Sequence, residues 1–182
     1  LGYLRGHEIT PDFWMAIDPH EDIAKYLTAP PDGITYYVCS WCHPSVFAAL
    51  ANRDVVVFHS LSEEIVPPAD QPAIGGGPTC LSRAPTLGYM LGYDEIHVFG
   101  CDGCWQDAGH VDGRAVENID TQMTKVTTNT VTNTRTEQAM GTVGMQKVEF
   151  EGVTYNTCLE FIGQAQAFLQ IAKMFPGKLV FH

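Results

Sequence analysis

A glycine-rich turn opens the stretch of the sequence that carries the most chemistry. Three glycines and two further residues follow a short apolar segment, and apolar residues at helical spacing come after them; the five are Gly75, Gly76, Gly77, Pro78 and Thr79. Glycines let a backbone approach a ligand closely, and the first turn of a helix has N–H groups that the helix does not use. This glycine turn (residues 75–79) predicts a phosphate site to which Arg83 adds positive charge, although a tight turn without a ligand has the same pattern.

A second turn, residues 100–103, contains an acidic side chain between two glycines. Residues 95–99 are apolar enough to predict a buried strand, and Asp102 follows that strand directly. A carboxylate at the carboxyl end of a parallel strand can accept a hydrogen bond from a ribose or acceptor hydroxyl, or bind Mg²⁺. Asp102 is therefore a candidate catalytic residue; the alternative is an aspartate that caps the turn.

Asp18 repeats this arrangement after the apolar residues 13–17. Aspartates at the carboxyl ends of neighbouring strands face one crevice, so Asp18 is a candidate ligand-binding residue, with turn capping as its alternative. His110 lies in a polar loop beyond Asp102 and is a candidate general acid or base, unless it is simply solvated. His43 and His59 also follow strands and are weaker candidates, whereas His97 lies inside a strand and is interpreted as structural.

The six cysteines include two C-x-x-C pairs, Cys39 with Cys42 and Cys101 with Cys104. The 58 residues between Cys42 and Cys101 far exceed the usual spacing of a zinc ribbon, which is roughly 15–20 residues. Buried or incidental thiols are the favoured interpretation, and a structural zinc site or a redox pair is the lesser alternative. No metal site is predicted, and no G-x-S-x-G or local cysteine-protease signature occurs.

Alternating strands and helices must position these residues. Strands are expected at 13–17, 34–38, 55–58, 95–99 and 179–181, and helices at 20–27, 44–50, after Thr79 and at 158–175. This alternation predicts an α/β protein with a three-layer, Rossmann-like and mostly parallel sheet. Residues 121–136 hold eight threonines and form either a flexible lid or an edge hairpin, and residues 147–156 predict a β-hairpin around Glu151 and Gly152.

Length and charge narrow the class of protein. A chain of 182 residues has the length of one domain, and its net charge of −11 argues against nonspecific binding of nucleic acid or anionic membranes. No apolar run approaches the roughly 18 residues of a membrane span, and no secretion signal is evident, so a cytoplasmic protein is expected. The sequence leaves open whether the chain forms an oligomer.

Three segments in order resemble the 6-hydroxymethylpterin diphosphokinase MptE-like family. They are PDFWMAIDP at residues 11–19, GGGPT at 75–79 and LGYDEIHVFGCD at 91–102. That family includes the central domain of motility-associated glycosyltransferases, and its fold is related to bacterial sialyltransferases that use CMP-sugars. The resemblance implies a nucleotide or nucleotide-sugar donor as the partner. Asp18, the glycine turn and Asp102 match the family's motifs.

The resemblance also implies a single domain over residues 1–182 that lacks the family's first strand and its G-x-G-P-S-L-type loop. The implied function is a nucleotide-dependent transferase that moves a sugar from a nucleotide-sugar. Diphosphate transfer from ATP, which requires Mg²⁺, is one alternative. A nucleotide- or glycan-binding module without catalysis is another. The sequence has no D-x-D pair, which favours the metal-independent glycosyl route.

Overall fold

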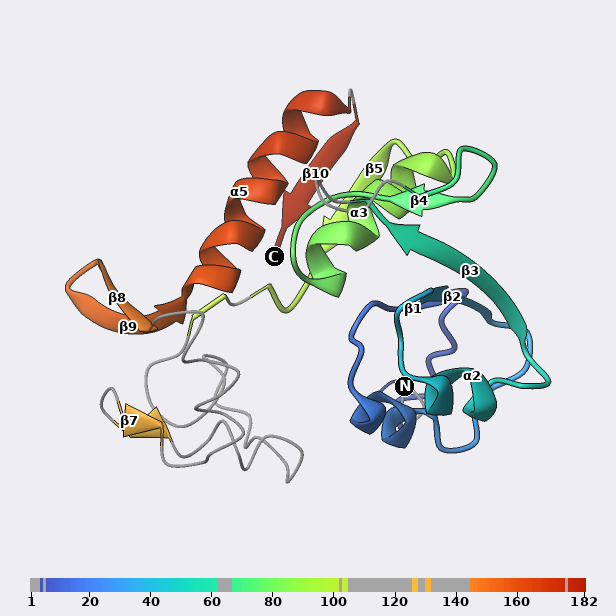
Figure 1. Cartoon of the computed structure of the whole chain (residues 1–182). Helices are drawn as coiled ribbons and strands as arrows, with labels where there is room; N and C mark the ends of the chain where they lie inside the picture. The colour runs from blue at the N-terminus through green and yellow to red at the C-terminus, as the bar shows by residue number, and fades with distance from the viewer. Residues whose placement is uncertain are drawn as a thin grey trace. The chain divides into compact units, whose positions relative to one another are not determined.

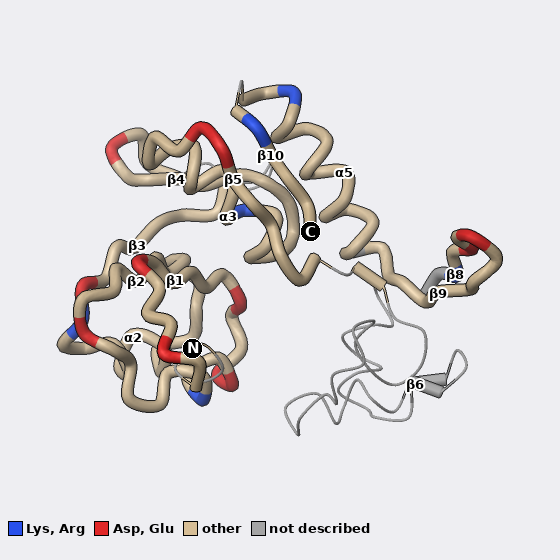
Figure 2. The backbone as a smooth tube through the Cα atoms, turned by 180° about the vertical axis from the view of Figure 1, so that it is seen from behind, with Lys and Arg blue, Asp and Glu red and all other residues tan. Residues whose placement is uncertain are grey.

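The computed structural model in Figure 1 describes residues 4, 6–61, 67–101, 103–104, 126–127, 130–131, 145–175 and 177–182. The chain packs as two compact units, Leu1–Met90 and Leu91–His182. Acidic residues occur in both units, as Figure 2 shows, in keeping with the net negative charge. Each unit is a mixture of helices and strands, which confirms the α/β class.

The first unit contains a curled sheet of four parallel strands. The strands are β1 (Phe13–Ala16), β2 (Thr35–Cys39), β3 (Asp54–Ser60) and β4 (Ala73–Ile74), and they lie side by side in chain order. Their β-branched and aromatic residues favour extended backbone and pack well on a pleated surface. The register aligns Ala16 with Val38 and Val38 with Val57. The mostly parallel sheet expected from the sequence is confirmed for this unit.

Three helical segments each follow a strand of this sheet. They are the 3₁₀ helix η1 (Glu21–Leu27) and the α-helices α2 (Pro44–Ala49) and α3 (Cys80–Met90). Helix α2 packs against η1, and α3 packs against β1 and β4. His43 caps α2, because its Nδ1 accepts a hydrogen bond from the Ser45 N–H at 3.3 Å. This weaker histidine candidate therefore has a structural role in the fold.

The core of the first unit includes side chains from β2, β3 and the segment of α2, together with others from β1, η1, β4 and α3. Tyr36, Phe58, Val46 and Leu50 are almost completely buried. Burying a large apolar side chain stabilises a fold by about 1.5–3 kcal/mol relative to leaving it exposed. The Tyr36 hydroxyl donates to the main-chain oxygen of Pro31 at 2.9 Å, so this buried polar atom is satisfied.

The second unit pairs its strands two by two. Strand β5 (Glu95–Val98) lies parallel to β10 (Lys178–Phe181), and helix α5 (Leu159–Met174) precedes β10. Strands β8 (Met145–Phe150) and β9 (Val153–Cys158) form the expected antiparallel hairpin. Its turn residues Glu151 and Gly152 both have positive φ, 51° and 76°, as a two-residue I′ turn requires.

Of two sequence-based expectations in the second unit, the burial of β5 is wrong, whereas a hairpin in the threonine-rich segment agrees with the structure. Strand β5 was expected to be buried, but Glu95 and His97 are exposed and Val98 is its one buried residue. Among the described strands β5 pairs with β10 alone, so its polar side chains alternate toward solvent. In the threonine-rich segment, β6 (Val126–Thr127) pairs antiparallel with β7 (Thr130–Val131), which agrees with a hairpin there.

None of the helices that the structure describes combines the length and the apolar character that a membrane crossing requires. The three-layer Rossmann-like arrangement stays a prediction.

Candidate functional site

The carboxyl ends of the four parallel strands of the first unit meet at one edge of the sheet. Asp18 follows β1, Ser40 follows β2, Ser60 ends β3, and Gly75 follows β4. In parallel α/β sheets, ligands bind outside this edge. The structure therefore brings Asp18 and the glycine turn, both predicted from the sequence, to the same edge.

The glycine turn joins β4 to α3 by close backbone packing. Gly76 has φ of +117° and Gly77 of +93°, backbone conformations that residues other than glycine rarely adopt. A Cβ added to Gly76 would lie 2.8 Å from Thr86 Oγ1 and 2.9 Å from the main-chain oxygen of Ser82. The packing of the turn on α3 thus requires glycine at position 76, whether or not a ligand binds.

Helix α3 begins with a reciprocal pair of caps. Thr79 Oγ1 accepts a hydrogen bond from the Ser82 N–H at 3.1 Å, and Ser82 Oγ accepts one from the Thr79 N–H at 3.2 Å. This is the arrangement of a capping box, with serine in place of the usual glutamate or glutamine. The hydroxyl of Thr79 is used by the helix, so a role of Thr79 toward a ligand stays a prediction.

Arg83 is buried at the end of β4. The side chain is 6% exposed, and Nη1 donates to the main-chain oxygen of Ile74 at 2.6 Å. Its Nε has no hydrogen-bond partner among the described residues, and neither does the hydroxyl of Ser60, which is 2% exposed and pairs in register with Ile74. Burial lowers the pKa of the Arg83 guanidinium, but arginine keeps its charge in proteins. Two donors are therefore left without acceptors beside the glycine turn.

A buried cation without an anion is unusual because desolvation of the charge is costly. The effective penalty is several kcal/mol per ion unless a counter-charge or hydrogen bonds compensate it. No ion pair of Arg83 occurs among the described residues. This arrangement favours an anionic ligand, for which Arg83 would be the counter-charge.

Asp18 has a local contact in the structure. Its Oδ1 accepts a hydrogen bond from the His20 N–H at 2.9 Å and so fixes the turn into η1. This contact agrees with the turn-capping alternative. Asp18 is half-buried, and its charge contributes to raising the pKa of the neighbouring Cys42 and Cys80 thiols.

The cysteines of the first unit are free buried or half-buried thiols. Burial, with smaller contributions from Cys39, Cys80 and Asp18, raises the pKa of Cys42 to about 12. Cys42 Sγ donates to the main-chain oxygen of Ala16 at 3.5 Å. A protonated thiol is a poor nucleophile and a poor metal ligand, which agrees with the interpretation as buried thiols.

Asp102 and His110, the two predicted catalytic residues, lie outside the described residues. The positions on either side of Asp102 are described. Gln164 Nε2 of α5 donates to Cys101 Sγ at 3.2 Å, and Thr157 Oγ1 of β9 donates to the main-chain oxygen of Gly103 at 2.7 Å. The segment that carries Asp102 is therefore joined to β9 and α5 on both sides of that residue.

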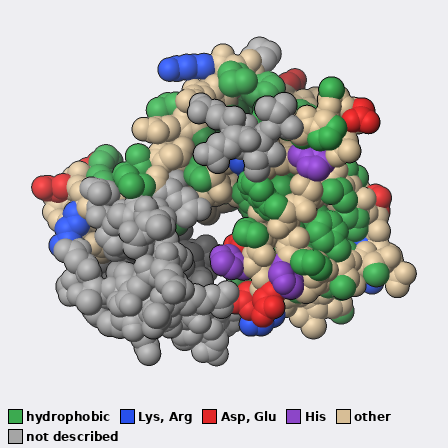
Figure 3. Space-filling model, viewed as in Figure 1, with side chains coloured by type: hydrophobic (Ala, Val, Ile, Leu, Met, Phe, Trp, Pro, Cys, Tyr) green, Lys and Arg blue, Asp and Glu red, His purple; other side chains and the backbone are tan. Residues whose placement is uncertain are grey.

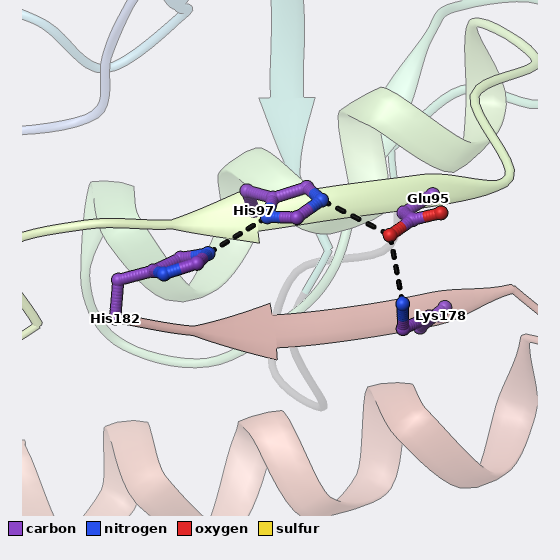
Figure 4. Close-up of polar contacts among 4 residues, drawn as sticks. All are labelled: Glu95, His97, Lys178 and His182. Carbon is purple, nitrogen blue, oxygen red and sulfur yellow. Dashed lines mark hydrogen bonds and ion pairs between the residues drawn. The ribbon is translucent and has the colours of Figure 1, made fainter.

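His97 belongs to a polar network across the β5–β10 pair, shown in Figure 4. Its Nδ1 lies 2.7 Å from His182 Nε2, and its Nε2 lies 3.0 Å from Glu95 Oε1. Lys178 Nζ donates to the same Glu95 oxygen at 2.9 Å. His182 also stacks on Phe99, with ring centroids 4.3 Å apart. These contacts join the two strands and agree with a structural role for His97.

Comparison with protein-family models, curated proteins and solved structures gave no match for this chain. The resemblance to the MptE-like family therefore stays a prediction. Among the described residues, no three His, Cys, Asp or Glu side chains are grouped so that they could hold a metal ion.

Sequence reasoning missed one chain of polar side chains at this edge. Ser40 Oγ lies 2.9 Å from His59 Nδ1, and His59 Nε2 is hydrogen-bonded to Gln71 Oε1. Each of these residues lies at or just outside the end of a strand. For His59 this position is the signal that makes it one of the weaker candidates in the sequence. Their contact depends on strand register, which the sequence does not reveal.

Proposed function

We propose that this protein is a nucleotide-dependent transferase that binds the phosphate of a nucleotide-sugar donor at the glycine turn and transfers the sugar to an acceptor hydroxyl. The observation that supports it is the buried guanidinium of Arg83, which has no acidic partner among the described residues. A phosphate oxygen is the kind of acceptor that Arg83 Nε and Ser60 Oγ lack.

Two further features support an anion at this position. Helix α3 spans eleven residues, and the N-terminus of a helix favours negative charge through its dipole and its unused N–H groups. The glycine turn that precedes α3 lies at the carboxyl edge of a parallel sheet, where Rossmann-like proteins bind nucleotides. A Rossmann-like arrangement of the sheet is part of this proposal.

The charge balance favours a donor with few phosphates. Among the described residues Arg83 is the cation beside the glycine turn, and the whole chain has a net charge of −11. One arginine can balance the single phosphate of a CMP-sugar. The polyphosphate of ATP carries more charge and requires Mg²⁺ or further cations. In this proposal Asp18 belongs to the donor site, and the sequence-based assignment of Asp102 and His110 as the catalytic residues stays a prediction.

The test is ligand binding by the purified chain. CMP, a CMP-sugar and ATP with Mg²⁺ are titrated at equal concentrations, and the melting temperature is recorded. At ten times its Kd a ligand adds about 1.4 kcal/mol to stability, which raises the melting temperature by a few degrees. We expect CMP and the CMP-sugar to give the larger rise, and we expect the Arg83→Met variant to lose it.

Arg53→Met is the matched control. Arg53 precedes β3 at the opposite end of the strands, where its Nε donates to the main-chain oxygen of Pro30 and its Nη1 pairs with Asp32 at 2.9 Å. This variant should retain the ligand-induced rise. A larger rise with ATP and Mg²⁺ favours diphosphate transfer, and no rise with any of these ligands at millimolar concentration refutes the proposal.

Turnover separates an enzyme from a binding module. Release of CMP from a bound CMP-sugar, with water or an added acceptor, is followed by chromatography. We expect release that falls in the Asp102→Asn and His110→Ala variants. Binding of CMP without any release supports the non-catalytic alternative.

A further inference from the structure

Ser40, His59 and Gln71 form a hydrogen-bonded chain at the carboxyl edge of the first unit's sheet. Ser40 lies in the turn between β2 and α2, and the Cys42 N–H closes this turn on the main-chain oxygen of Cys39 at 2.9 Å. His59 is the penultimate residue of β3, and Gln71 lies just before β4. The three side chains thus come from successive segments of one parallel sheet.

Main-chain hydrogen bonds hold two of these residues in place. The Ser40 N–H donates to the main-chain oxygen of Phe58 at 2.8 Å, and the His59 N–H donates to that of Pro72 at 2.8 Å. Cys39 and Phe58 are partners in the register, so Ser40 and His59 are the next pair along the two strands. Their contact therefore follows from the strand pairing.

The hydrogen bonds decide which nitrogen of His59 carries the proton. Gln71 Oε1 is an acceptor, so His59 Nε2 must donate to it and carry the hydrogen. In the neutral ring Nδ1 then has the lone pair, and it lies 2.9 Å from the Ser40 hydroxyl. A hydroxyl that donates to a histidine oriented by a third group is the arrangement that activates nucleophilic serines.

The solvent exposure of the hydrogen-bonded side chains suits a nucleophilic Ser40. Ser40 is exposed and His59 is half-buried, so a substrate can reach the hydroxyl while the ring is held by protein on part of its surface. Figure 3 shows histidine side chains that reach the molecular surface. The turn between a parallel strand and the next helix is also where α/β-hydrolases place their serine, although Ser40 lacks the flanking glycines of that motif.

We propose that Ser40 is a nucleophile activated by His59 as general base, with Gln71 as the residue that positions the ring, and that its substrates are electrophilic esters of phosphorus or carboxylic acids. In the first step Ser40 Oγ attacks the electrophilic atom, the leaving group departs with the bonding electron pair, and the hydroxyl proton moves to His59 Nδ1. The Gln71 carbonyl oxygen stabilises the resulting imidazolium through Nε2–H. This inference goes beyond the proposed transferase and does not depend on it.

The test uses diisopropyl fluorophosphate on the full chain, with the modified residue located by peptide mass spectrometry. In this reaction the Ser40 Oγ–P bond forms, the P–F bond breaks, fluoride leaves and the proton passes to His59. We expect modification at Ser40 that is abolished in Ser40→Ala. In His59→Ala the rate should fall by at least about 100-fold, the lower limit for loss of a general base.

Variants at Gln71 separate positioning from a merely structural role. Gln71→Ala should slow the modification, and Gln71→Glu should restore it, because a carboxylate orients the ring and stabilises the imidazolium. Far-UV circular dichroism confirms that each variant is folded.

Ser45 and His43 provide an internal control. His43 Nδ1 lies 2.8 Å from Ser45 Oγ but also accepts the Ser45 N–H, and Ser45 Oγ donates to the main-chain oxygen of Glu21. This imidazole is therefore occupied by a backbone donor, and Ser45 should stay unmodified. Equal modification of Ser40 and Ser45, no modification of Ser40, or a Ser40 rate that is unchanged in His59→Ala overturns the proposal.

Discussion

Arg83 and Ile74 are joined by a hydrogen bond of 2.6 Å that links helix α3 to the end of strand β4. The bond runs from a charged, buried guanidinium to a main-chain oxygen, so it satisfies the oxygen but leaves the charge without a counter-ion among the described residues. An arginine retained for ligand binding has this character, because its charge is costly until the ligand arrives.

Replacement of Arg83 by Met should therefore not destabilise the ligand-free protein. The change removes a buried charge, whose desolvation costs several kcal/mol, and leaves the Ile74 oxygen without its donor at a cost of about 1–3 kcal/mol. We expect a free energy of unfolding equal to or above that of the wild type, measured by urea denaturation. A loss of more than about 2 kcal/mol would show that Arg83 mainly supports the fold.

Gly76→Ala should lower the free energy of unfolding far more than Gly33→Ala. Both positions have positive φ, +117° and +77°, so both substitutions introduce backbone strain. At Gly76 the new Cβ would also meet Thr86 Oγ1 and the Ser82 main-chain oxygen inside 3.0 Å, whereas nothing lies within 4 Å of a Cβ at Gly33. We expect a loss of about 1–2 kcal/mol for Gly33→Ala from the left-handed conformation alone.

For Gly76→Ala the collision with the α3 backbone adds about 1–3 kcal/mol to that loss. Urea denaturation of the two variants in parallel measures the difference. Equal losses would mean that the turn can move away from α3, and that glycine at position 76 is needed for its φ alone.

Local patterns predicted most of the first unit because its strands are short runs of β-branched and aromatic residues. Residues 13–17, 34–38 and 55–58 were assigned as strands and lie within two residues of β1, β2 and β3. Helix α3 was also found, although Pro85 lies inside it. The apolar spacing of α3 outweighed this proline, which costs the helix one hydrogen bond.

The contacts of the candidate site were not predictable from these patterns. Nothing in the spacing of α3 shows that Arg83 faces the end of β4, because a charged residue on a helix is more often solvated. The contact between Ser40 and His59 requires the register of β2 on β3, which depends on tertiary packing. The exposure of His97 depends on the neighbours of β5, which local sequence does not specify.

Cys42 should resist alkylation in the native protein. Burial raises its pKa to about 12 from an ordinary value of 9.0, so at pH 8 only about one thiol in ten thousand is ionised. Iodoacetamide at pH 8, followed by peptide mapping, should modify Cys42 at a small fraction of its rate in urea. A native rate close to the urea rate would contradict the assigned environment.

The same shift sets a dependence of stability on alkaline pH. A raised pKa in the folded state contributes stability that is present below pH 9 and is lost as the pH rises toward 12, because the unfolded thiol ionises first. Unfolding free energies measured between pH 8 and 10.5 should therefore fall less steeply in Cys42→Ala than in the wild type. A parallel decline in both proteins would show that the Cys42 thiol does not contribute.

Glu95 should make the β5–β10 pair sensitive to acid. Hydrogen bonds from Lys178 and His97 lower the pKa of this carboxyl group, and the charged form is the one that joins the two strands. A lowered pKa in the folded state gives a contribution that is present above the ordinary pKa of 4.5 and is lost as the pH falls through the lowered value. The melting temperature of the wild type should thus fall more between pH 6 and 3 than that of Glu95→Gln.

Glu149→Gln, at an exposed position on β8, removes the same charge elsewhere in the second unit and should retain the wild-type acid dependence. If both variants follow the wild-type curve, the network of Figure 4 contributes nothing measurable to the pairing of β5 with β10.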